Sequence, residues 1–482
     1  MKLHRWLLLP LLLLAGCFPE ERAWWSPQGD RALIRLADGL HLTTADGQLG
    51  AALDGTAEAQ SVSWLGDGSG FVVLRTRVVS RWEEARALLQ AKEVQAVEAL
   101  LPLIQPLLEA AARDARALDD LMNGLSELQS QRFAAALRLQ HEQAPAEIET
   151  KLRALPKGAE LAAALARPEA GHTLQELLLI RLGDEGRVTE TRPLARRLLK
   201  PLHLPRVSPR QPLLALLSLD NDGRSLVLEV LPLDGGTGHV VARQVSAAFD
   251  WTPDGRSLVF MAPLGGEGEK LVSLLRLEVV DANGVLLRPR LEMGPDGQPV
   301  EQRGPGRLGE PTPLATALQF NRPLLQVLAD GRVLFASLPV TLPAVVPDPE
   351  LAPRLFLADG QTVVPVPTAP GDLPANLGWF TASPDGQRVA VVESETDAVA
   401  VVELATGATQ ILSPAHPGWQ CRTLPAWKSA TELSFAALHD GAPAWHLWQS
   451  KGDTRRLSGA WPTEALANWL EHKKADVPPQ KP

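Results

Sequence analysis

The chain has 482 residues, of which 45% are hydrophobic and 21% charged, as in a folded globular protein. Its formal net charge is −9, and removal of a signal containing Lys2 and Arg5 brings it to −11. An acidic surface argues against nonspecific binding to nucleic acid or anionic lipid, so we expect no nucleic-acid partner. Cys17 and Cys421 are the only cysteines in the sequence, and disulfides therefore do not hold the fold.

The first residues have the pattern of an export signal. Lys2, His4 and Arg5 are basic, and the apolar run Trp6–Leu14 that follows is too short to span a bilayer as a helix. No later segment has about 18 uninterrupted apolar residues, so we expect the rest of the chain to be soluble and outside the inner membrane.

The apolar run ends in Leu14-Ala15-Gly16-Cys17, which resembles the lipobox of bacterial lipoproteins. The resemblance implies that residues 1–16 are a signal peptide and that Cys17 becomes a lipidated first residue, with diacylglycerol and an N-acyl chain such as palmitate. Several acyl chains on one residue anchor a protein stably. Phe18 follows the cysteine, which resembles outer-membrane sorting. A plain secretory signal is the alternative. Because an acylated Cys17 cannot pair, Cys421 is expected to be buried and inert, with a reactive thiol as the alternative.

The ten residues Trp251–Phe260 recur along the chain with small variations. They predict a strand ending at a Trp, a tight turn in which Gly supplies positive φ, and an apolar strand that leaves. The first turn of each module is predicted at Pro27-Gln28-Gly29, Gly66-Asp67-Gly68, Asn221-Asp222-Gly223, Pro253-Asp254-Gly255, Ala329-Asp330-Gly331, Pro384-Asp385-Gly386 and Lys428-Ser429-Ala430. The second is predicted at Asp46-Gly47, Asp184-Glu185-Gly186, Asp234-Gly235, Asn283-Gly284, Asp359-Gly360, Thr406-Gly407 and Lys451-Gly452-Asp453. This alternation predicts seven four-stranded blades of about 40–45 residues each.

The repeat resembles that of TolB-type β-propellers, whose core is an aromatic residue followed by Ser-Pro-Asp-Gly and a basic residue. The match is best at Trp251–Phe260 and Ser383–Ala390, weaker at Trp25–Gly29 and Trp64–Gly68, and reduced to the Trp alone at Trp427. The resemblance implies a mainly β, WD-repeat-like propeller and no particular function, because propellers host many unrelated activities.

Two features leave the architecture open. Asp254–Asp330 is long for one module, and we interpret Gly294–Pro313 within it as an exposed loop, with a hidden eighth blade as the alternative. Few residues separate Cys17 from Trp25, so a strand from the C-terminal end could complete the first blade.

One segment, Arg81–Arg167, does not fit the β array because it is rich in Ala, Leu, Glu, Gln and Arg. Apolar residues follow helical spacing at Leu118, Leu121, Met122, Leu125 and Leu128, and again at Val97, Leu100, Leu101 and Ile104, while Pro102, Pro106, Pro145 and Pro156 mark kinks or helix ends. The strand-like flanks predict that these helices replace a hairpin tip in the second blade.

The chain thus divides into a signal peptide (1–16), a first part of the propeller (17–80), an inserted helical segment (81–170), the remainder of the propeller (171–461) and a C-terminal helix with its tail (462–482). The helix is predicted over Thr463–Lys474, and Ala475–Pro482 is expected to be disordered.

We identify no catalytic or metal-binding constellation in the sequence. A hydrolase domain beside the propeller would need a Gly-x-Ser-x-Gly elbow, and Ser69 with its glycine neighbours is better interpreted as part of a turn. His439 and His446 flank another turn and have no evident third ligand.

The acidic and Trp residues of the repeat have structural interpretations. Asp254, Asp330 and Asp385 are predicted to accept backbone N–H groups within their turns, with a calcium site at the propeller axis as the alternative. Four Trp residues are predicted to lie in the core between blades: Trp25, Trp64, Trp251 and Trp427. Four more are predicted to pack the last blade and close the ring, or to line an aromatic pocket for sugar or peptide: Trp419, Trp445, Trp448 and Trp461.

These patterns favour a noncatalytic lipoprotein of the bacterial envelope without cofactor or metal, held on the outer membrane facing the periplasm by lipid on Cys17. Its propeller would bind a ligand or an envelope protein. One alternative is a propeller enzyme, a glycan lyase or hydrolase, with His, Arg and Glu side chains clustered at one end of the central channel. Another is a structural accessory of an envelope assembly. The helical segment is either a docking arm or a lid over the ring.

Overall fold

The computed structural model describes residues 21–470 except 115–124, 156–157, 168–170, 199–201, 221–222, 224, 265–270, 294–298, 319–323, 339–353, 361, 369–376, 394–397, 414–422 and 440–441. The predictions for Cys17, Cys421 and Trp419, and for the tail beyond residue 470, lie outside the described residues.

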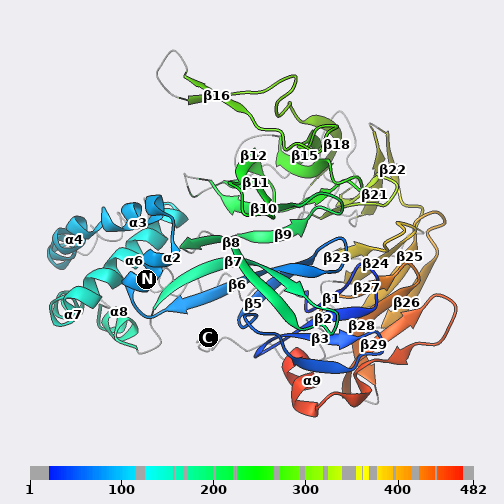
Figure 1. Cartoon of the computed structure of the whole chain (residues 1–482), viewed down its shortest axis with the longest axis horizontal. Coiled ribbons are helices and arrows are strands. Elements are labelled where there is room, and N and C mark those ends of the chain that lie inside the picture. The colour runs from blue at the N-terminus through cyan, green and yellow to red at the C-terminus, as the bar shows by residue number, and fades with distance from the viewer. Residues whose placement is uncertain are drawn as a thin grey trace.

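Seven four-stranded antiparallel sheets fan around a common centre in the described part of the chain (Figure 1). Blades 1 to 3 are β1 (Ala23–Trp25), β2 (Arg31–Leu36), β3 (Gly39–Thr44) and β4 (Leu49–Ala52); β5 (Ala59–Trp64), β6 (Gly70–Val79), β7 (His172–Leu182) and β8 (Val188–Leu198); and β9 (His203–Val207), β10 (Leu213–Leu219), β11 (Leu226–Pro232) and β12 (His239–Val245). Blades 4 and 5 are β13 (Phe249–Trp251), β14 (Ser257–Pro263), β15 (Leu271–Glu278) and β18 (Thr312–Leu318); and β19 (Leu325–Val327), β20 (Val333–Ser337), β21 (Arg354–Asp359) and β22 (Thr362–Pro365). Blades 6 and 7 are β23 (Leu377–Ala382), β24 (Arg388–Glu393), β25 (Val399–Glu403) and β26 (Thr409–Ser413); and β27 (Ala426–Ser429), β28 (Glu432–His439), β29 (Ala442–Gln449) and β30 (Arg455–Arg456). The predicted seven-bladed β-propeller is confirmed.

The extra length of the fourth module is an insertion within a blade. β16 (Arg290–Met293) and β17 (Pro299–Gln302) form a separate two-stranded sheet between the third and fourth strands of blade 4. The interpretation of Gly294–Pro313 as a loop was therefore wrong at β17 and at the start of β18, because these residues pair with neighbouring strands.

One predicted turn was misplaced. Asn221-Asp222-Gly223 lies between β10 and β11, the second and third strands of blade 3, whereas we had expected it to follow the inner strand. The first turn of this blade follows Val207 at Ser208-Pro209, where the Ser208 N–H donates to the carbonyl of Leu213. The predicted number of seven blades is nevertheless right, because blade 3 has a first turn at Ser208-Pro209 in place of the one predicted.

The repeated Trp ties three of the seven inner strands to the blade before them. Its indole N–H donates to a backbone carbonyl of that blade in three places: Trp64 to Trp24 (3.0 Å), Trp251 to Arg206 (2.9 Å) and Trp427 to Thr381 (2.9 Å). In the other direction, inner-strand side chains accept backbone N–H groups of the following blade: Ser63 from Val207, Asp250 from Val327 and Gln326 from Ala382. An inner strand has one unpaired edge, so these bonds satisfy groups that would otherwise lack protein partners. The prediction that the repeat's Trp residues lie between blades is confirmed for the buried Trp25, Trp251 and Trp427, while Trp64 is half-buried.

The turn aspartates act as predicted. One carboxylate oxygen accepts the backbone N–H two residues later in each turn: Asp254 from Arg256 (3.1 Å), Asp330 from Arg332 (3.0 Å) and Asp385 from Gln387 (3.1 Å). The glycine that follows has φ of 69° at Gly255 and 67° at Gly386, a region that side chains with a Cβ rarely adopt.

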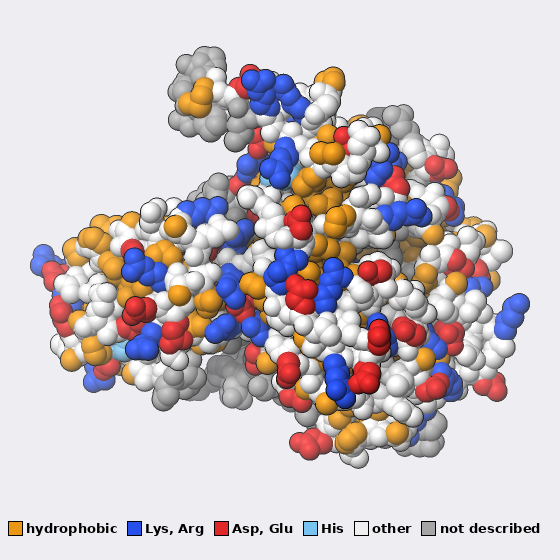
Figure 2. Space-filling view, in the orientation of Figure 1, with side chains coloured by type: hydrophobic (Ala, Val, Ile, Leu, Met, Phe, Trp, Pro, Cys, Tyr) orange, Lys and Arg blue, Asp and Glu red, His pale blue; other side chains and the backbone are white. Residues whose placement is uncertain are grey.

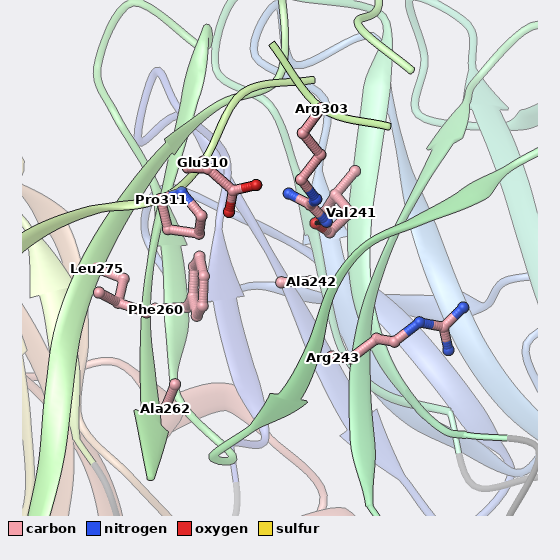
Figure 3. A pocket seen from close by; sticks show the side chains of 9 residues that line it. All are labelled: Val241, Ala242, Arg243, Phe260, Ala262, Leu275, Arg303, Glu310 and Pro311. Carbon is pink, nitrogen blue, oxygen red and sulfur yellow. Dashed lines mark hydrogen bonds between the residues drawn. The ribbon is translucent and has the colours of Figure 1, made fainter. Parts of the chain in front are cut away.

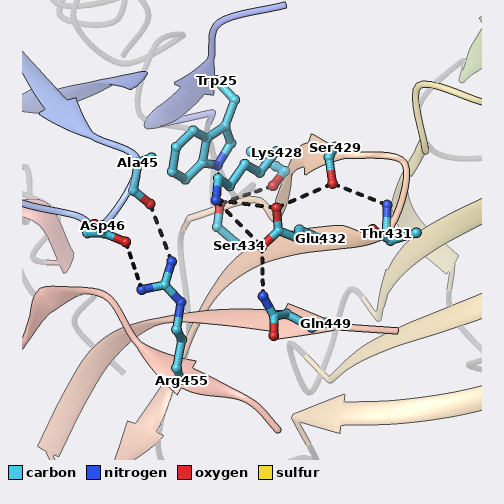
Figure 4. A network of polar contacts seen from close by, with 11 residues as sticks. Trp25, Ala45, Asp46, Lys428, Ser429, Thr431, Glu432, Ser434, Gln449 and Arg455 are labelled. Atoms are coloured by element: carbon cyan, nitrogen blue, oxygen red, sulfur yellow. Dashed lines mark hydrogen bonds and ion pairs between the residues drawn. The ribbon is translucent and has the colours of Figure 1, made fainter. Parts of the chain in front are cut away.

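No strand is exchanged where the described ring closes, which decides a point that the sequence left open: the C-terminal end supplies no strand to blade 1. Blade 1 consists wholly of N-terminal strands and blade 7 wholly of C-terminal ones. Side chains close the gap: Trp25 stacks on Trp445 with ring centroids 5.6 Å apart. The indole N–H of Trp25 also donates to Ser434 Oγ at 2.8 Å, and Figure 4 shows these two residues side by side. Lys428 Nζ lies 5.5 Å from the Trp25 ring centroid and 3.3 Å from Glu432 Oε2. N-terminal strands already supply all four strands of blade 1, so the blade needs none from the C-terminal end.

A C-terminal segment covers this junction. The 3₁₀ helix η1 (Ser458–Ala460) and α9 (Thr463–Leu470) follow blade 7, and Trp461 donates its indole N–H to the carbonyl of Gly47 in blade 1 at 2.7 Å. Trp469 on α9 is fully buried against Trp445 and Trp461. Trp445, Trp448 and Trp461 are all buried, so the packing interpretation of these residues is confirmed over the aromatic pocket.

The helical insertion lies between β6 and β7 of blade 2, as predicted (Figure 1, left). It contains α2 (Trp82–Leu88), α3 (Ala91–Glu98), α4 (Leu101–Arg113), α6 (Glu127–Gln143), α7 (Pro145–Arg153) and α8 (Gly158–Leu165), which we call the helical lobe. The predicted single stripe from Val97 to Ile104 is divided between α3 and α4. Pro102 lies in the first turn of α4 and Pro145 begins α7, where a missing N–H costs nothing, while Pro106 lies inside α4. Leu118, Leu121 and Met122 lie outside the described residues.

Candidate functional site

Three charged residues meet around the inner strands of the ring. Arg206 is on β9, Asp250 is on β13, and Glu21 immediately precedes blade 1. Arg206 Nη2 lies 3.6 Å from Glu21 Oε1, and the indole N–H of Trp24 donates to Glu21 Oε2 at 3.1 Å. Asp250 accepts the backbone N–H of Val327 at 3.0 Å.

We call Glu21, Arg206 and Asp250 the axial cluster; in it, opposite charges lie close enough to offset one another. Burial raises the pKa of the Asp250 carboxyl, and the Arg206 guanidinium offsets this only in part. Burial acts to lower the pKa of Arg206, but the carboxylates of Glu21 and Asp250 outweigh it and the pKa is raised. Both acids hold structural hydrogen bonds, so the cluster neutralises charge between blades. Sequence reasoning missed it; the signal was a charged residue directly before the repeat's strand-ending position, as at Asp250 before Trp251.

A second charged cluster holds the base of the helical lobe. The Glu176 carboxylate on β7 is fully buried and accepts hydrogen bonds from Arg75 Nε (2.9 Å), Arg75 Nη2 (2.6 Å) and Arg196 Nε (2.9 Å). A third cation, Arg77, lies 3.6 Å away. Burial alone would raise the pKa of Glu176, but the arginines outweigh it and hold the pKa below its ordinary value of 4.5. Its signal in the sequence is a single acid within the apolar run of β7.

The lobe is also attached to the hairpin through a buried histidine. Nε2 of His172, at the start of β7, lies 2.5 Å from Glu142 Oε1 on α6, and the other oxygen of Glu142 accepts the backbone N–H of Trp82 at 2.9 Å. Trp82 packs edge-on against the His172 ring. Burial is the main cause that lowers the pKa of His172, which favours the neutral ring. Val79, Leu174 and Leu198 of blade 2 join the apolar core of the lobe, so lobe and blade share one hydrophobic cluster.

The outer face of α4 is largely apolar and exposed. Leu103 has 58% of its surface exposed, and Pro102, Pro106 and Ala110 beside it are exposed too. Figure 2 shows hydrophobic side chains gathered over the helical lobe, at the left of the view. Among the described residues, one helical stretch, Ala91–Arg113, is long and apolar enough by composition to cross a membrane. Its most apolar 18 residues have a mean hydropathy of 1.2, and 28% of them are buried.

A cavity of about 240 Å³ lies between β12 of blade 3 and β14 and β15 of blade 4 (Figure 3). Phe260, Leu275 and Pro311 form part of its apolar wall, and Arg303 crosses above them to donate to the carbonyl of Val241 at 2.8 Å. Ligand sites usually span about 300–1,000 Å³, so this cavity is small for one. We interpret it as a packing gap under the 303–311 segment.

The remaining predicted site residues fall in structural roles. His446 is buried and stacks on Phe435, and Asp67 accepts both the N–H and the hydroxyl of Ser69 within its turn. His439 lies at the end of β28. Among the residues that the structure describes, no group of three or more His, Cys, Asp or Glu side chains is placed to hold a metal.

Comparison with models of known protein families found no match, and neither did comparison with curated proteins. Among solved structures, the chain is similar to TolB from Acinetobacter baumannii, at 15% identity and a TM-score of 0.38 over 58% of this chain and 59% of that one. It is also similar to puromycin hydrolase in complex with PGG, at 12% identity and a TM-score of 0.46 over 93% of this chain and 55% of that one. The β-propeller domain of the Trilobed protease from Pyrococcus furiosus, described as having an open velcro topology, matches at 11% identity and a TM-score of 0.36 over 59% of this chain and 79% of that one. The chain therefore spans little more than half of TolB and of puromycin hydrolase.

The sheets and their order define the class of protein: a seven-bladed β-propeller with a helical lobe inserted in its second blade. The structural neighbours are similar to it at the level of the fold.

Proposed function

We propose that the chain is a noncatalytic binding protein of the bacterial envelope, anchored by lipid on Cys17 and facing the periplasm from the outer membrane, which binds an envelope protein through its ring and helical lobe. The lobe is the observation that carries this proposal. Blade 2 has the same four strands as the other blades, so the ring does not need the helical lobe for its closure. The chain nevertheless gives the lobe a large apolar core, which is shared with blade 2, and attaches it through Glu142, Glu176 and His172. Appendages on a rigid scaffold are where propellers and other folds carry recognition.

The noncatalytic part of the proposal rests on the axial cluster. A propeller enzyme would need an acid or base free to act on substrate. In the cluster, Asp250 accepts backbone N–H groups and Glu21 is held by Trp24 and Arg206. We therefore favour binding over glycan cleavage.

The test is chemical crosslinking in the native envelope followed by capture of the tagged chain. In one variant, residues 81–170 are replaced by Asn-Gly, which closes the β6–β7 hairpin between Val79 and His172, a pair in the native register. A matched control removes the other appendage, the β16–β17 hairpin, by replacing residues 290–302 in the same way.

We expect one recurrent partner with the parent chain and the control, and weaker recovery of that partner with the lobe variant, because the ring would still bind it. Loss of every partner favours the structural-accessory alternative, in which the lobe is the sole contact. Repeated recovery of no partner by the parent chain contradicts the proposal. Mass spectrometry of the native N-terminus tests the anchor separately, since an unmodified thiol at Cys17 would exclude it.

A further inference from the structure

The two faces of α3 and α4 have different environments. Val97, Ile104 and Leu108 are buried in the core of the lobe, whereas Leu103 projects from the opposite side with half-buried Leu107 beside it. Because Val97, Ile104 and Leu108 pack in the core of the lobe, the stretch Ala91–Arg113 could cross a membrane as a helix only if that core came apart. What remains available is one apolar face.

This face is also electrically neutral. From Val94 to Ala112 the sequence contains two charged residues, Glu98 and Glu109. Glu98 accepts the indole N–H of Trp82 at 3.1 Å, and Glu109 pairs with Lys151 at 3.1 Å, so cations and donors of the lobe itself occupy both. A protein partner for such a face would have to be equally devoid of charge, whereas a lipid surface meets it without any specific complement.

The topology places the lobe on the side of the ring where the chain begins. In a blade that runs outward from the centre, the inner strand starts at the same ring face as the turn between the second and third strands. The β6–β7 hairpin therefore points toward the face at which β1 starts. A hydrogen bond shows how far the hairpin reaches toward this face. The N–H of Thr76 on β6 donates to the carbonyl of Glu58, which lies just before the start of the inner strand β5, and β6 continues beyond this point for Arg77–Val79.

The lipid proposed on Cys17 lies close to that face. Four residues of extended chain reach at most about 14 Å, so a membrane holding Cys17 is within that reach of Glu21 beside the inner strands. We propose that the exposed face of α4, centred on Leu103, lies on the lipid surface, with its apolar side chains at the boundary between head groups and acyl chains. Lys92 and Arg113, at the two ends of the stretch, are placed to keep their charges among the head groups.

This inference rests on the proposed anchor for its geometry, but its test does not need the lipid. A soluble chain of residues 18–482 retains every described residue and is mixed with vesicles of phosphatidylethanolamine and phosphatidylglycerol, and the bound fraction is measured by sedimentation. Leu103→Glu places a charge at the centre of the face. Ile411→Glu is the matched control, because Ile411 on β26 of blade 6 is 68% exposed and lies outside the lobe.

We expect the parent chain and Ile411→Glu to bind equally and Leu103→Glu to bind about tenfold more weakly. Binding should persist at high salt and without phosphatidylglycerol, since the face is neutral. The inference is overturned if the parent chain does not sediment with vesicles, if Leu103→Glu binds as well as the parent, or if binding requires phosphatidylglycerol and is lost with salt. It is also overturned if ultracentrifugation without lipid finds a dimer that Leu103→Glu dissociates, because the face would then meet a second copy. Thermal melting confirms that both variants fold, and the modification state of Cys17 decides the anchor independently.

Discussion

Replacing Glu176 with Gln tests whether one buried carboxylate holds the hairpin that carries the helical lobe. The substitution preserves the shape of the side chain and removes its charge. Arg75, Arg77 and Arg196 would then lie around a neutral amide. Its oxygen can accept a hydrogen bond from one guanidinium, but its NH₂ group would face the N–H donors of the others.

The magnitude follows from the bonds that are lost. Glu176 accepts three charge-assisted hydrogen bonds, and such bonds contribute about 1.5–3 kcal/mol each. Gln replaces one of them, which leaves a loss of about 3–6 kcal/mol. Arg75 and Arg196 retain partial exposure and can regain water, so we expect the free energy of unfolding to fall by about 3 kcal/mol.

Urea denaturation followed by circular dichroism measures this change at neutral pH. Glu185→Gln is the control, because Glu185 pairs with Arg187 at 3.2 Å on the turn of the same blade but is 74% exposed, and we expect a change within about 0.5 kcal/mol. A Glu176→Gln variant within about 1 kcal/mol of the parent would refute the reasoning and assign the stability of the hairpin to its apolar contacts.

The pH dependence gives an independent check. The pKa of Glu176 is lower in the folded chain than its ordinary value of 4.5, so its stabilising contribution is complete above that value and is lost as the pH falls through the folded pKa. The stability difference between the parent and Glu176→Gln should therefore shrink below pH 4.5. A difference that stays constant across this range would contradict the assignment.

Three further substitutions test the links between blades, each by urea denaturation. Trp251→Phe keeps the ring packed but removes the indole N–H that donates to Arg206, and should cost about 1–2 kcal/mol; no loss would mean that packing alone joins blades 3 and 4. Trp469→Ala empties a fully buried site at the ring closure and should cost about 3–5 kcal/mol, with earlier proteolysis of the C-terminal segment; unchanged proteolysis would count against side-chain closure. Asp385→Ala removes the acceptor for the Gln387 N–H and should cost about 1 kcal/mol, and an equally stable variant would show that the turn does not depend on this bond.

The parts of the fold that could be predicted from the sequence are those set by local chemistry. Gly255 and Gly386 have the positive φ expected of their turns, and the apolar runs beside them are strands. The insertion in blade 2 was evident because helical spacing interrupts a period of strands. These signals depend on neighbours within a few residues, which a single sequence contains.

Contacts between distant residues could not be predicted in this way. Glu21 and Arg206 lie 185 positions apart in the sequence and meet because the ring brings β1 and β9 near one axis. The sequence left the ring closure open for a similar reason: the short stretch before Trp25 allowed a strand from the C-terminal end, whereas Trp25 instead stacks on Trp445 from that end of the chain. Pairing at such distances is decided by the geometry of the assembled ring.

The side-chain closure of the ring also bears on how this molecule can change over generations. The four strands of each blade follow one another along the chain with no strand borrowed from another blade, so an in-frame duplication or deletion can add or remove a whole blade without leaving half of one behind. A ring that shared a strand between its ends would tie the first and last parts of its coding sequence together. Here the first and last blades need only to present complementary surfaces. Selection would therefore act mainly on the few tryptophans that pack between these two blades.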